Sequence, residues 1–576
     1  MVALGLGLGL ASTSPAWAQE PELTWSGRVQ SDLRFRPESA EVGHFYDKQE
    51  LPSGVARNQN MIGTTLHIKM GDVAAVADID FVLYGFSRDL NGIGALALRE
   101  NVDPYRFDVH QLYVEVKNIF VDGLDLRVGQ QLVQWGVGDQ FNPTNNLNAD
   151  NVEDSLRFGD QLGNAMVRLD YWINDTWSIT GVLVPVFKPA LLPNTGYLGT
   201  ARVDRIPLTD ASLRHRIESE NASIGGPLLG NPTMVSSVTP ELPATSFENM
   251  QFGYRIGGTI AEQEISFSYY LGRTDFPQPI RNHAHQDQTA RCNPDAPTDC
   301  VKGLMLTDVT LGYPRMHVYG FNMAGEIGWL KDASEVFNAI GYRLEGALIV
   351  PQRSTLKITN DQINIAFPQP AGEYDYDNDH HPGGPEPAVV DATPFLKWVV
   401  GLDYSFGEHV MVIAQWVHGF VDEFGAGDFI KEGWTVVESG VTSSDMDTTL
   451  RCSLPRDGTT CAREVVRPRL GDYLVAIVDV KFLDSKALLR LLGILYLNGV
   501  HEQYWDPVAQ QRVSDYHNIF TSDGFSAVLY PEFNYNFGNG LELGGGGLVM
   551  LGNRNSKFGD PQTGGTLIWT RGRYSF

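Results

Sequence analysis

The chain of 576 residues carries 69 acidic and 43 basic side chains, a formal net charge of -26. This acidic balance excludes a nucleic-acid-binding protein of the usual kind, which presents a basic stripe to phosphates. Glycine and aromatic residues are abundant, with 60 Gly, 28 Phe, 22 Tyr and 11 Trp, yet the mean hydropathy is only -0.17. That combination is typical of a membrane barrel, in which lipid-facing apolar residues alternate with polar ones. Neither an internal repeat nor a linker is visible, which indicates one long domain.

The N-terminus predicts a secretory signal. An apolar stretch rich in Gly and Leu leads to Ala16, Trp17 and Ala18, which match the small-x-small pattern of a cleavage site. The expected division is a signal peptide at 1–18 and a mature domain at 19–576. The alternative is a buried apolar segment or a short anchor, although the run is too short to span a bilayer as a helix. Beyond it, no stretch of about 18 apolar residues occurs, which excludes conventional transmembrane helices.

Apolar and polar residues alternate along much of the remaining chain. In the first such segment Trp25, Val29 and Leu33 share one face, and Arg28 and Asp32 share the other. The same pattern recurs around residues 62–70, 79–84, 111–117, 124–131, 167–171, 342–348 and 474–482. Because strand side chains alternate at period two, these segments predict strands between lipid and water. Their length of about ten residues suits tilted transmembrane strands, whereas a soluble β-sandwich has shorter strands and an apolar inner face.

Short and long connections alternate between the predicted strands. Short turns are expected at 71–72, 118–123, 174–175, 330–335, 406–408, 484–486 and 538–540. In bacterial barrels short turns are periplasmic and long loops are extracellular. We therefore predict an all-β fold, a transmembrane antiparallel β-barrel of about 18 strands (16 is the alternative) with long extracellular loops. Residues 304–313 stay open between an extra strand and a hairpin that extends beyond the membrane.

The C-terminus carries a specific short signal. Residues 566–576 alternate, with Ile568, Tyr574 and the final Phe576 on one face and Arg571 on the other. The segment resembles the terminal strand that the barrel-assembly machinery recognises in outer-membrane proteins. The expected location is the outer membrane of a Gram-negative bacterium, with its lipid and lipopolysaccharide as partners.

The cysteines and one acidic segment suggest loop sites. Cys292 with Cys300, and Cys452 with Cys461, form two local pairs in predicted loops, and an oxidising compartment favours two disulfides. A metal site is the alternative, but the spacing does not favour it. The acidic segment places Asp375, Asp377 and Asp379 at alternate positions, which resembles the start of a calcium-binding loop. Its alternatives are a solvated loop and, through the adjacent histidines, a transition-metal site. No other cofactor is expected.

The polar faces of the predicted strands should line the lumen. They carry Arg28, Asp32, Arg34, Asp78, Asp80, Glu115, Asp125, Arg127, Arg168, Asp170, Arg255, Arg343 and Glu345, followed by Asp403, Asp479, Arg490, Glu532, Arg571 and Arg573. Basic and acidic walls facing each other would set up a transverse field that selects polar solutes. The alternative is that these charges pair with one another and brace the wall. So many buried charges require either water or dense pairing.

Two loops could narrow the lumen. Residues 138–164 follow the third upward strand and include Phe141, Asn142, Asp150, Glu153, Asp154 and Arg157, and we expect them to form the constriction. Residues 189–250 are far longer, and a connection of this length is usually functional or disordered. We expect this second loop to cap the barrel, with a plug as the alternative.

One segment resembles a known family. Residues 129–136 read Gly-Gln-Gln-Leu-Val-Gln-Trp-Gly, and Phe141-Asn-Pro143 and Arg157 follow. This pattern is similar to that of a proteobacterial outer-membrane family of unknown function, whose members are suspected of moving hydrophobic compounds, sometimes alongside inner-membrane pumps. The resemblance covers about 30 residues; it implies a barrel and leaves the substrate open.

Three functions follow as hypotheses. The first is a porin-like channel for passive, substrate-selective passage of small solutes, which is not an enzyme. The second is a conduit for hydrophobic or lipid-like compounds that works with an inner-membrane transporter. The third is an outer-membrane lipid hydrolase, but no Gly-x-Ser-x-Gly motif lies in a suitable strand-turn-helix context. Substrate, direction of transport and oligomeric state are left open.

Overall fold

The computed structural model describes residues 21–42, 49–85, 93–157, 159–192, 233–287, 289–301, 304–328, 340–352, 354–361, 372–373, 388–390, 393–420, 423, 464–466, 468, 470–506, 511–560 and 563–576. No helix in this part of the chain is long and apolar enough to cross a membrane. Several predicted features fall elsewhere: the signal at 1–18, Cys452, Cys461, the three aspartates at 375–379 and most of loop 189–250. They stay predictions.

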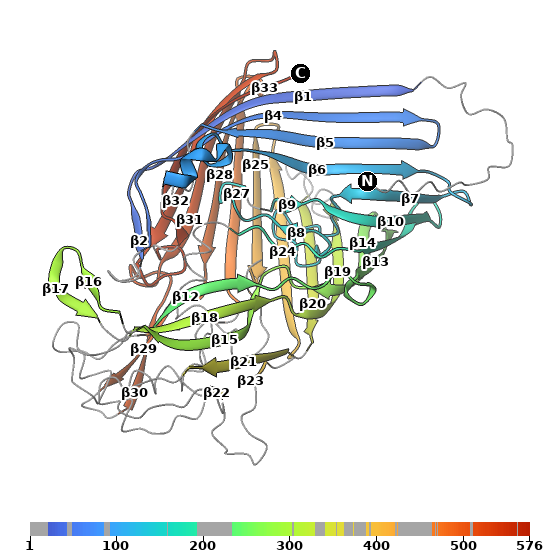
Figure 1. Cartoon of the computed structure of the whole chain (residues 1–576). Helices are drawn as coiled ribbons and strands as arrows, with labels where there is room; N and C mark the ends of the chain where they lie inside the picture. Colours follow the sequence, from blue (N-terminus) through green and yellow to red (C-terminus); the bar gives the residue numbers. More distant parts are fainter. Residues whose placement is uncertain are drawn as a thin grey trace.

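Eighteen antiparallel strands form one closed barrel (Figure 1). In ring order they are β1 (Glu22–Arg36), β4 (Gly54–Met70), β5 (Val73–Tyr84), β6 (Tyr105–Val116), β7 (Leu124–Gln131), β10 (Asn164–Trp172), β11 (Trp177–Val184), β13 (Gln251–Ile260), β14 (Gln263–Arg273), β19 (Arg315–Ile327), β20 (Ile340–Pro351), β24 (Phe395–Phe406), β25 (Val410–His418), β27 (Asp472–Phe482), β28 (Ala487–Tyr496), β31 (Ser526–Asn536), β32 (Leu541–Gly552) and β33 (Leu567–Ser575). Each strand pairs with the one before it, and β33 pairs with β1. The predicted barrel of 18 strands is confirmed, and the alternative of 16 is wrong.

The two ends of the chain close the ring. Phe576 exchanges backbone hydrogen bonds with Gly27 of β1, at 2.9 and 3.0 Å. A Cβ atom at Gly27 would lie 2.6 Å from the ring of Phe576, so only glycine lets this ring pack against the first strand. The ring of Trp25 meets it edge-on, with 5.3 Å between centroids. The C-terminal strand is therefore joined to the N-terminal strand by side chains as well as by backbone.

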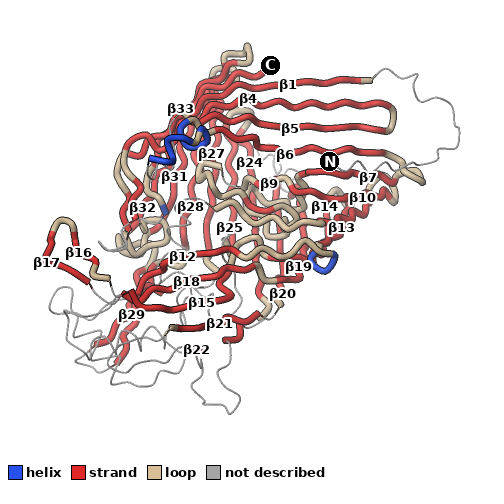
Figure 2. The backbone as a smooth tube through the Cα atoms, in the orientation of Figure 1, coloured by secondary structure: helices blue, strands red, loops and turns tan. Residues whose placement is uncertain are grey.

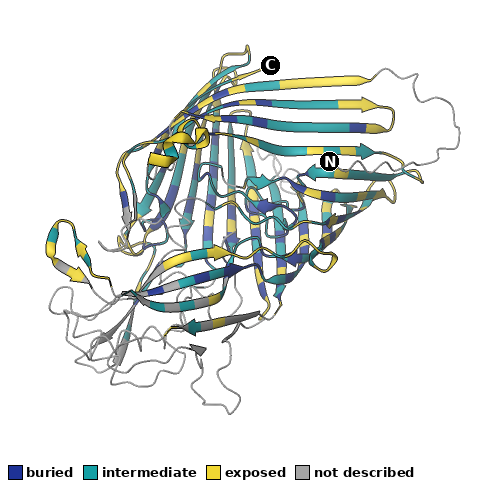
Figure 3. Cartoon of the chain, in the orientation of Figure 1, coloured by how far each residue is buried: buried dark blue, intermediate teal, exposed yellow. Residues whose placement is uncertain are grey.

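The outer face of the wall is apolar, as the alternation predicts. Trp25, Leu33 and Phe35 are 60%, 45% and 47% exposed, whereas Asp32 and Arg34 between them are 2% and 4% exposed. Exposed and buried residues alternate along the strands in the same way in Figure 3. A closed wall with an apolar exterior satisfies every strand hydrogen bond while it faces lipid, which is the requirement for crossing a bilayer.

Additional strands gather at the loop end of the barrel, the end that carries the long connections. A six-stranded sheet there contains β12 (Thr233–Pro240), β15 (Gln278–Asp287), β18 (Leu304–Gly312), β21 (Ser354–Asn360), β22 (Gly372–Glu373) and β23 (Ala388–Val390). Smaller pairings join β2 (Ala40–Val42) with β3 (Gln49–Leu51), β8 (Ala149–Asp150) with β9 (Gln161–Leu162), and β26 (Glu464–Val466) with β29 (Val500–Asp506) and β30 (Gln511–His517). The segment left open at 304–313 is thus a strand outside the barrel wall.

Helix is scarce in the described chain, as the tube in Figure 2 shows. The helical segments are η2 (Ile93–Ala97), α1 (Arg99–Val102) and η4 (Phe247–Asn249), all of which lie in loops. The opposite end of the barrel, the turn end, has short connections such as 71–72, 261–262 and 407–409. The turns at 71–72 and 407–409 agree with predicted turns, whereas the turn at 261–262 was not predicted.

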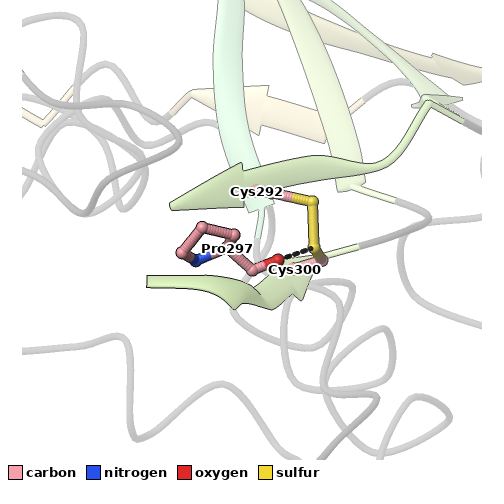
Figure 4. The surroundings of a disulfide bond; sticks show 3 residues. All are labelled: Cys292, Pro297 and Cys300. Carbon is pink, nitrogen blue, oxygen red and sulfur yellow. Dashed lines mark hydrogen bonds between the residues drawn. A yellow bond between two sulfur atoms is a disulfide. The ribbon is translucent and has the colours of Figure 1, made fainter. Parts of the chain in front are cut away.

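One predicted disulfide is present. Cys292 on β16 (Arg291–Asn293) is bonded to Cys300 on β17 (Ala296–Val301), and the two residues face each other in the hairpin (Figure 4). The Sγ atom of Cys300 also approaches the carbonyl oxygen of Pro297 at 3.4 Å. The bond closes the β16–β17 hairpin, which is separate from the 18-stranded sheet of the barrel.

Candidate functional site

The third loop at the loop end, residues 132–163 and here named L3, folds into the barrel. Its first residues turn sharply after β7, where Gly138 is required because a Cβ atom there would lie 2.4 Å from the carbonyl oxygen of Phe141. Asn148 braces the turn: its amide donates to the carbonyl oxygens of Gln131 and Leu162, at 3.0 and 2.9 Å. Its own oxygen accepts from the Val133 N–H at 2.8 Å. The Asn-rich sequence thus supplies the hydrogen bonds that a loop inside a barrel needs.

Glu345 of β20 holds one side of L3. Its carboxylate accepts from the backbone N–H groups of Val137, Gly138 and Thr144, at 2.8, 3.0 and 2.8 Å. The hydroxyl of Thr144 donates to it as well, at 2.8 Å. The side chain is 3% exposed. A carboxylate that satisfies four donors in this way is a strong attachment point.

Two arginines hold the other side of L3. Arg34 of β1 forms a bidentate pair with Asp154, at 2.5 and 2.8 Å. Burial opposes ionisation of Asp154, but the hydrogen bonds and charge of Arg34 outweigh it and lower the pKa of this carboxyl to about 2. Arg106 of β6 forms a second pair with Glu153 at 3.0 Å. On this side of the lumen, the acidic residues of L3 are therefore bound to basic residues of the barrel wall.

A third attachment lies between these two sides. Asp139 pairs with Arg343 of β20 and accepts from Gln415 of β25 at 2.9 Å. Burial raises the pKa of Asp139, although the charge of Arg343 opposes the shift. The hydroxyl of Tyr530 donates to the Ser155 carbonyl oxygen at 2.9 Å.

Most of the predicted lumen charges are paired along the wall itself. Arg28 binds Asp80 at 2.8 Å, Arg127 binds Glu115 at 3.0 Å, and Arg168 binds Asp170 at 2.7 Å. Asp32 joins Arg34 and Arg571, at 2.8 and 3.0 Å. Asp78 accepts from the Thr65 hydroxyl, Asp125 from the Asn118 N–H, and Asp403 lies 3.3 Å from Arg343. These contacts favour local ion pairing, one of the two interpretations left open, over separate basic and acidic walls.

The remaining predicted loop residues lie in or beside L3. Asn142 borders a cavity, and the N–H of Asp150 donates to the carboxylate of Asp275 at 2.7 Å. Arg157 lies 3.7 Å from Asp154 and 3.6 Å from Asp160. Phe141 is 3% exposed, and its ring packs at a tilt against that of Phe420, with 5.2 Å between centroids. Their selective role remains a prediction.

Sequence reasoning missed an apolar inner wall at the loop end. Buried apolar side chains line this half of the barrel from β11 round to β33 and form two clusters. These include Val182, Val184, Tyr270, Met316, Val318, Ile349, Phe395, Val399, Val417, Tyr473, Val475, Ile494, Tyr496, Val528, Leu548 and Leu567, with Phe141, Phe420 and Phe558 packed against them from three loops. A signal was present, because residues 491–497 carry no charged side chain on either face.

A cavity of about 70 Å³ lies between L3, the start of the loop after β14 and the loop after β25. Phe141, Ile349 and Phe395 line its apolar side, and Asn145 and Lys397 are among its polar residues. An apolar cavity that takes up benzene has about twice this volume. The cavity is therefore too small for a solute of that size without some movement of its lining.

The wall and the loop together define a class of protein. A closed antiparallel barrel of 18 strands, with short turns at one end and long loops at the other, has the architecture of Gram-negative outer-membrane barrels. Residues 80–460 match the model of a family described as a protein of unknown function (DUF1302). The chain belongs to this family. Its description names no activity.

Comparison with solved structures returns outer-membrane proteins of very low sequence identity. OccAB4 of Acinetobacter baumannii is 7% identical with a TM-score of 0.42, and the match covers 98% of this chain and 100% of that one. OccK11 of Pseudomonas aeruginosa is 8% identical with a TM-score of 0.40, over 96% of each chain. The outer-membrane channel DcaP of A. baumannii is 8% identical with a TM-score of 0.33, over 96% of this chain and 97% of that one. No protein of curated function matches the sequence.

Proposed function

We propose that this protein is an outer-membrane channel for the passive passage of small solutes, and that L3 makes the passage selective. The observation that carries the proposal is the attachment of L3 to opposite sides of the barrel. Asp154 is bound to β1 and the loop backbone is bound by Glu345 of β20. These strands face each other across the ring, with nine strands between them one way round and seven the other.

Solutes would meet a narrowed and charged passage beside L3. Most of the wall charges named above are paired, so they present dipoles and hydrogen-bonding groups more than a strong net field. Passage of polar solutes is then governed by width and by hydrogen bonding at the loop.

Conductance in planar lipid bilayers tests this proposal. We expect a small, defined conductance from the native barrel, and a larger one from Glu345→Gln, because a neutral amide cannot satisfy the four donors of L3. Glu542→Gln is the matched control, since Glu542 pairs with Arg573 at 3.0 Å and touches no residue of L3. A native barrel that stays closed at every voltage would contradict the proposal.

The apolar inner wall favours a second candidate, a conduit for hydrophobic compounds that works with an inner-membrane transporter. The cavity beside Phe141 and Phe395 would be its entry point. Binding of a hydrophobic fluorophore to the barrel in nanodiscs tests this idea, and Phe395→Ser should weaken that binding. If the native barrel conducts ions and takes up no fluorophore, the first proposal holds alone.

A further inference from the structure

Arg255 of β13 differs from the other inward-facing arginines of the barrel. Each of the other inward-facing arginines named above lies within 3.3 Å of a carboxylate oxygen, as Arg28 does with Asp80 and Arg490 with Asp479. Among the described residues, no acidic side chain lies within ion-pair distance of Arg255. No protein group accepts a hydrogen bond from its buried Nε atom. Arg255 is partly buried and lies on the inward face of β13, the face of the buried residues Gln251 and Gly253.

The strand pairing explains why Arg255 has no partner. Paired arginines usually have an acid directly across the strand boundary: Arg490 faces Asp479 and Glu532, and Arg573 faces Glu542. Directly opposite Arg255 are Thr180 on β11 and Ser268 on β14. Residues paired in this way share a face of the sheet. The two positions directly opposite Arg255 therefore carry hydroxyl groups in place of acids.

The diagonal neighbours do not supply an acid either. They are Ser178 and Val182 on β11, and Ser266 and Tyr270 on β14. Along β13 itself the neighbours on the same face are Gly253 and Gly257, which leave space around the guanidinium. Small and hydroxyl-bearing residues thus surround a single positive charge.

More distant charges do not compensate Arg255 in full. Glu264, Arg168 and Glu345 act on it electrostatically. Arg168 is bound to Asp170, and the carboxylate of Glu345 is occupied by its four donors from L3. Arginine has five N–H donors in a planar fork, and leaving such donors unsatisfied when buried is unfavourable.

We infer that Arg255 is a binding position for the carboxylate group of a solute in the lumen. This inference rests on the proposed channel, because it names the chemistry of what passes. A carboxylate matches the planar fork of arginine in a bidentate geometry. Its single negative charge balances the guanidinium of Arg255, which has no acidic partner among the described residues, whereas a dianion would leave an unpaired charge in a partly buried site. The hydroxyl group of Ser268, directly opposite on β14, adds hydrogen-bonding capacity beside it.

Block of the ionic current by benzoate tests the inference, with Arg255→Gln and Arg573→Gln as matched variants. Both remove one positive charge from the lumen, but Arg573 is already paired with Glu542. We expect the half-blocking benzoate concentration to rise about tenfold in Arg255→Gln, which corresponds to the loss of a charged hydrogen bond. Arg573→Gln should leave it unchanged. Arg255→Lys should fall between the native protein and Arg255→Gln, because it keeps the charge and loses the fork.

Calorimetric titration of the purified barrel with benzoate gives a second readout that does not depend on conduction. An equal effect of Arg255→Gln and Arg573→Gln, or no effect of Arg255→Gln, overturns the inference and leaves the channel proposal standing. Binding that depends on Arg255 in a barrel without conductance supports the inference and overturns the channel. The heat-dependent shift of the folded barrel in electrophoresis shows that each variant has folded.

Discussion

The inner wall towards the turn end and the inner wall towards the loop end are built from the same strands but carry different chemistry. On β28 the inward residue near the turn end is Arg490, bound to Asp479 at 2.6 Å. Further along the same face are Ile494 and Tyr496, which are 1% and 2% exposed. The outward face of the strand is apolar throughout. The inner face therefore changes from a paired, charged lining to a packed core within one strand.

This difference shows two ways in which a wide barrel can hold loops inside its lumen. The apolar half holds loops by burial: Phe420 packs on Tyr473 with 4.7 Å between ring centroids, and Phe558 lies 6.3 Å from Tyr473. Across the ring, β1 holds L3 by the ion pair of Arg34 with Asp154. The loops are thus fixed by hydrophobic contacts on one side of the lumen and by ion pairs on the other.

The largest expected effect on stability comes from a substitution in the apolar inner wall towards the loop end. Ile494→Ala removes a side chain that is 1% exposed, and we expect it to lower the free energy of unfolding by about 2 to 5 kcal/mol. Leu491→Ala on the same strand is the control, because Leu491 faces lipid and is 44% exposed. The denaturant midpoint of the barrel in detergent measures both. Equal losses in the two variants would show that the inner apolar wall is not a core.

The next effect acts on the ion pairs of L3. The pKa of Asp154 is lowered from 3.8 to about 2 in the folded protein, so its contribution is present above pH 3.8 and is lost as the pH falls through about 2. The shift corresponds to about 2 kcal/mol of stabilisation at neutral pH. We expect conductance to increase as the pH is lowered through this window. The step should be absent in Asp154→Asn, and a native protein without it would contradict the role given to this pair.

The smallest effect is expected at the turn end. Arg573 and Glu542 form a pair that is 39% and 22% exposed, and pairs of this kind contribute less than about 1 kcal/mol. Arg573→Gln should therefore leave the denaturant midpoint almost unchanged. A loss of stability as large as that of Ile494→Ala would show that the charged inner wall towards the turn end is as tightly packed as the apolar inner wall towards the loop end.

Local sequence pattern was enough to predict the barrel. The alternation of residues such as Trp25, Arg28 and Leu33 reports which face of a strand meets lipid, because side-chain direction in a strand depends only on position along it. The strand number, the inward direction of the charged residues and the Cys292–Cys300 pair follow from the same kind of local information. The inward apolar residues were missed because an aqueous interior was assumed for the whole length of the wall.

Only the tertiary structure decided which residues meet inside the barrel. Asp154 and its partner Arg34 are 120 residues apart, and Thr144 and Glu345 are 201 apart, so no local pattern joins them. The same holds for Arg255, which is unpaired because Thr180 and Ser268 come to lie opposite it when β11 and β14 align with β13. Sequence by itself determined the wall and its two faces, since these depend on period-two alternation. The crossing of L3, and the lack of an acidic partner for Arg255 among the described residues, depend on which distant residues the closed ring brings together.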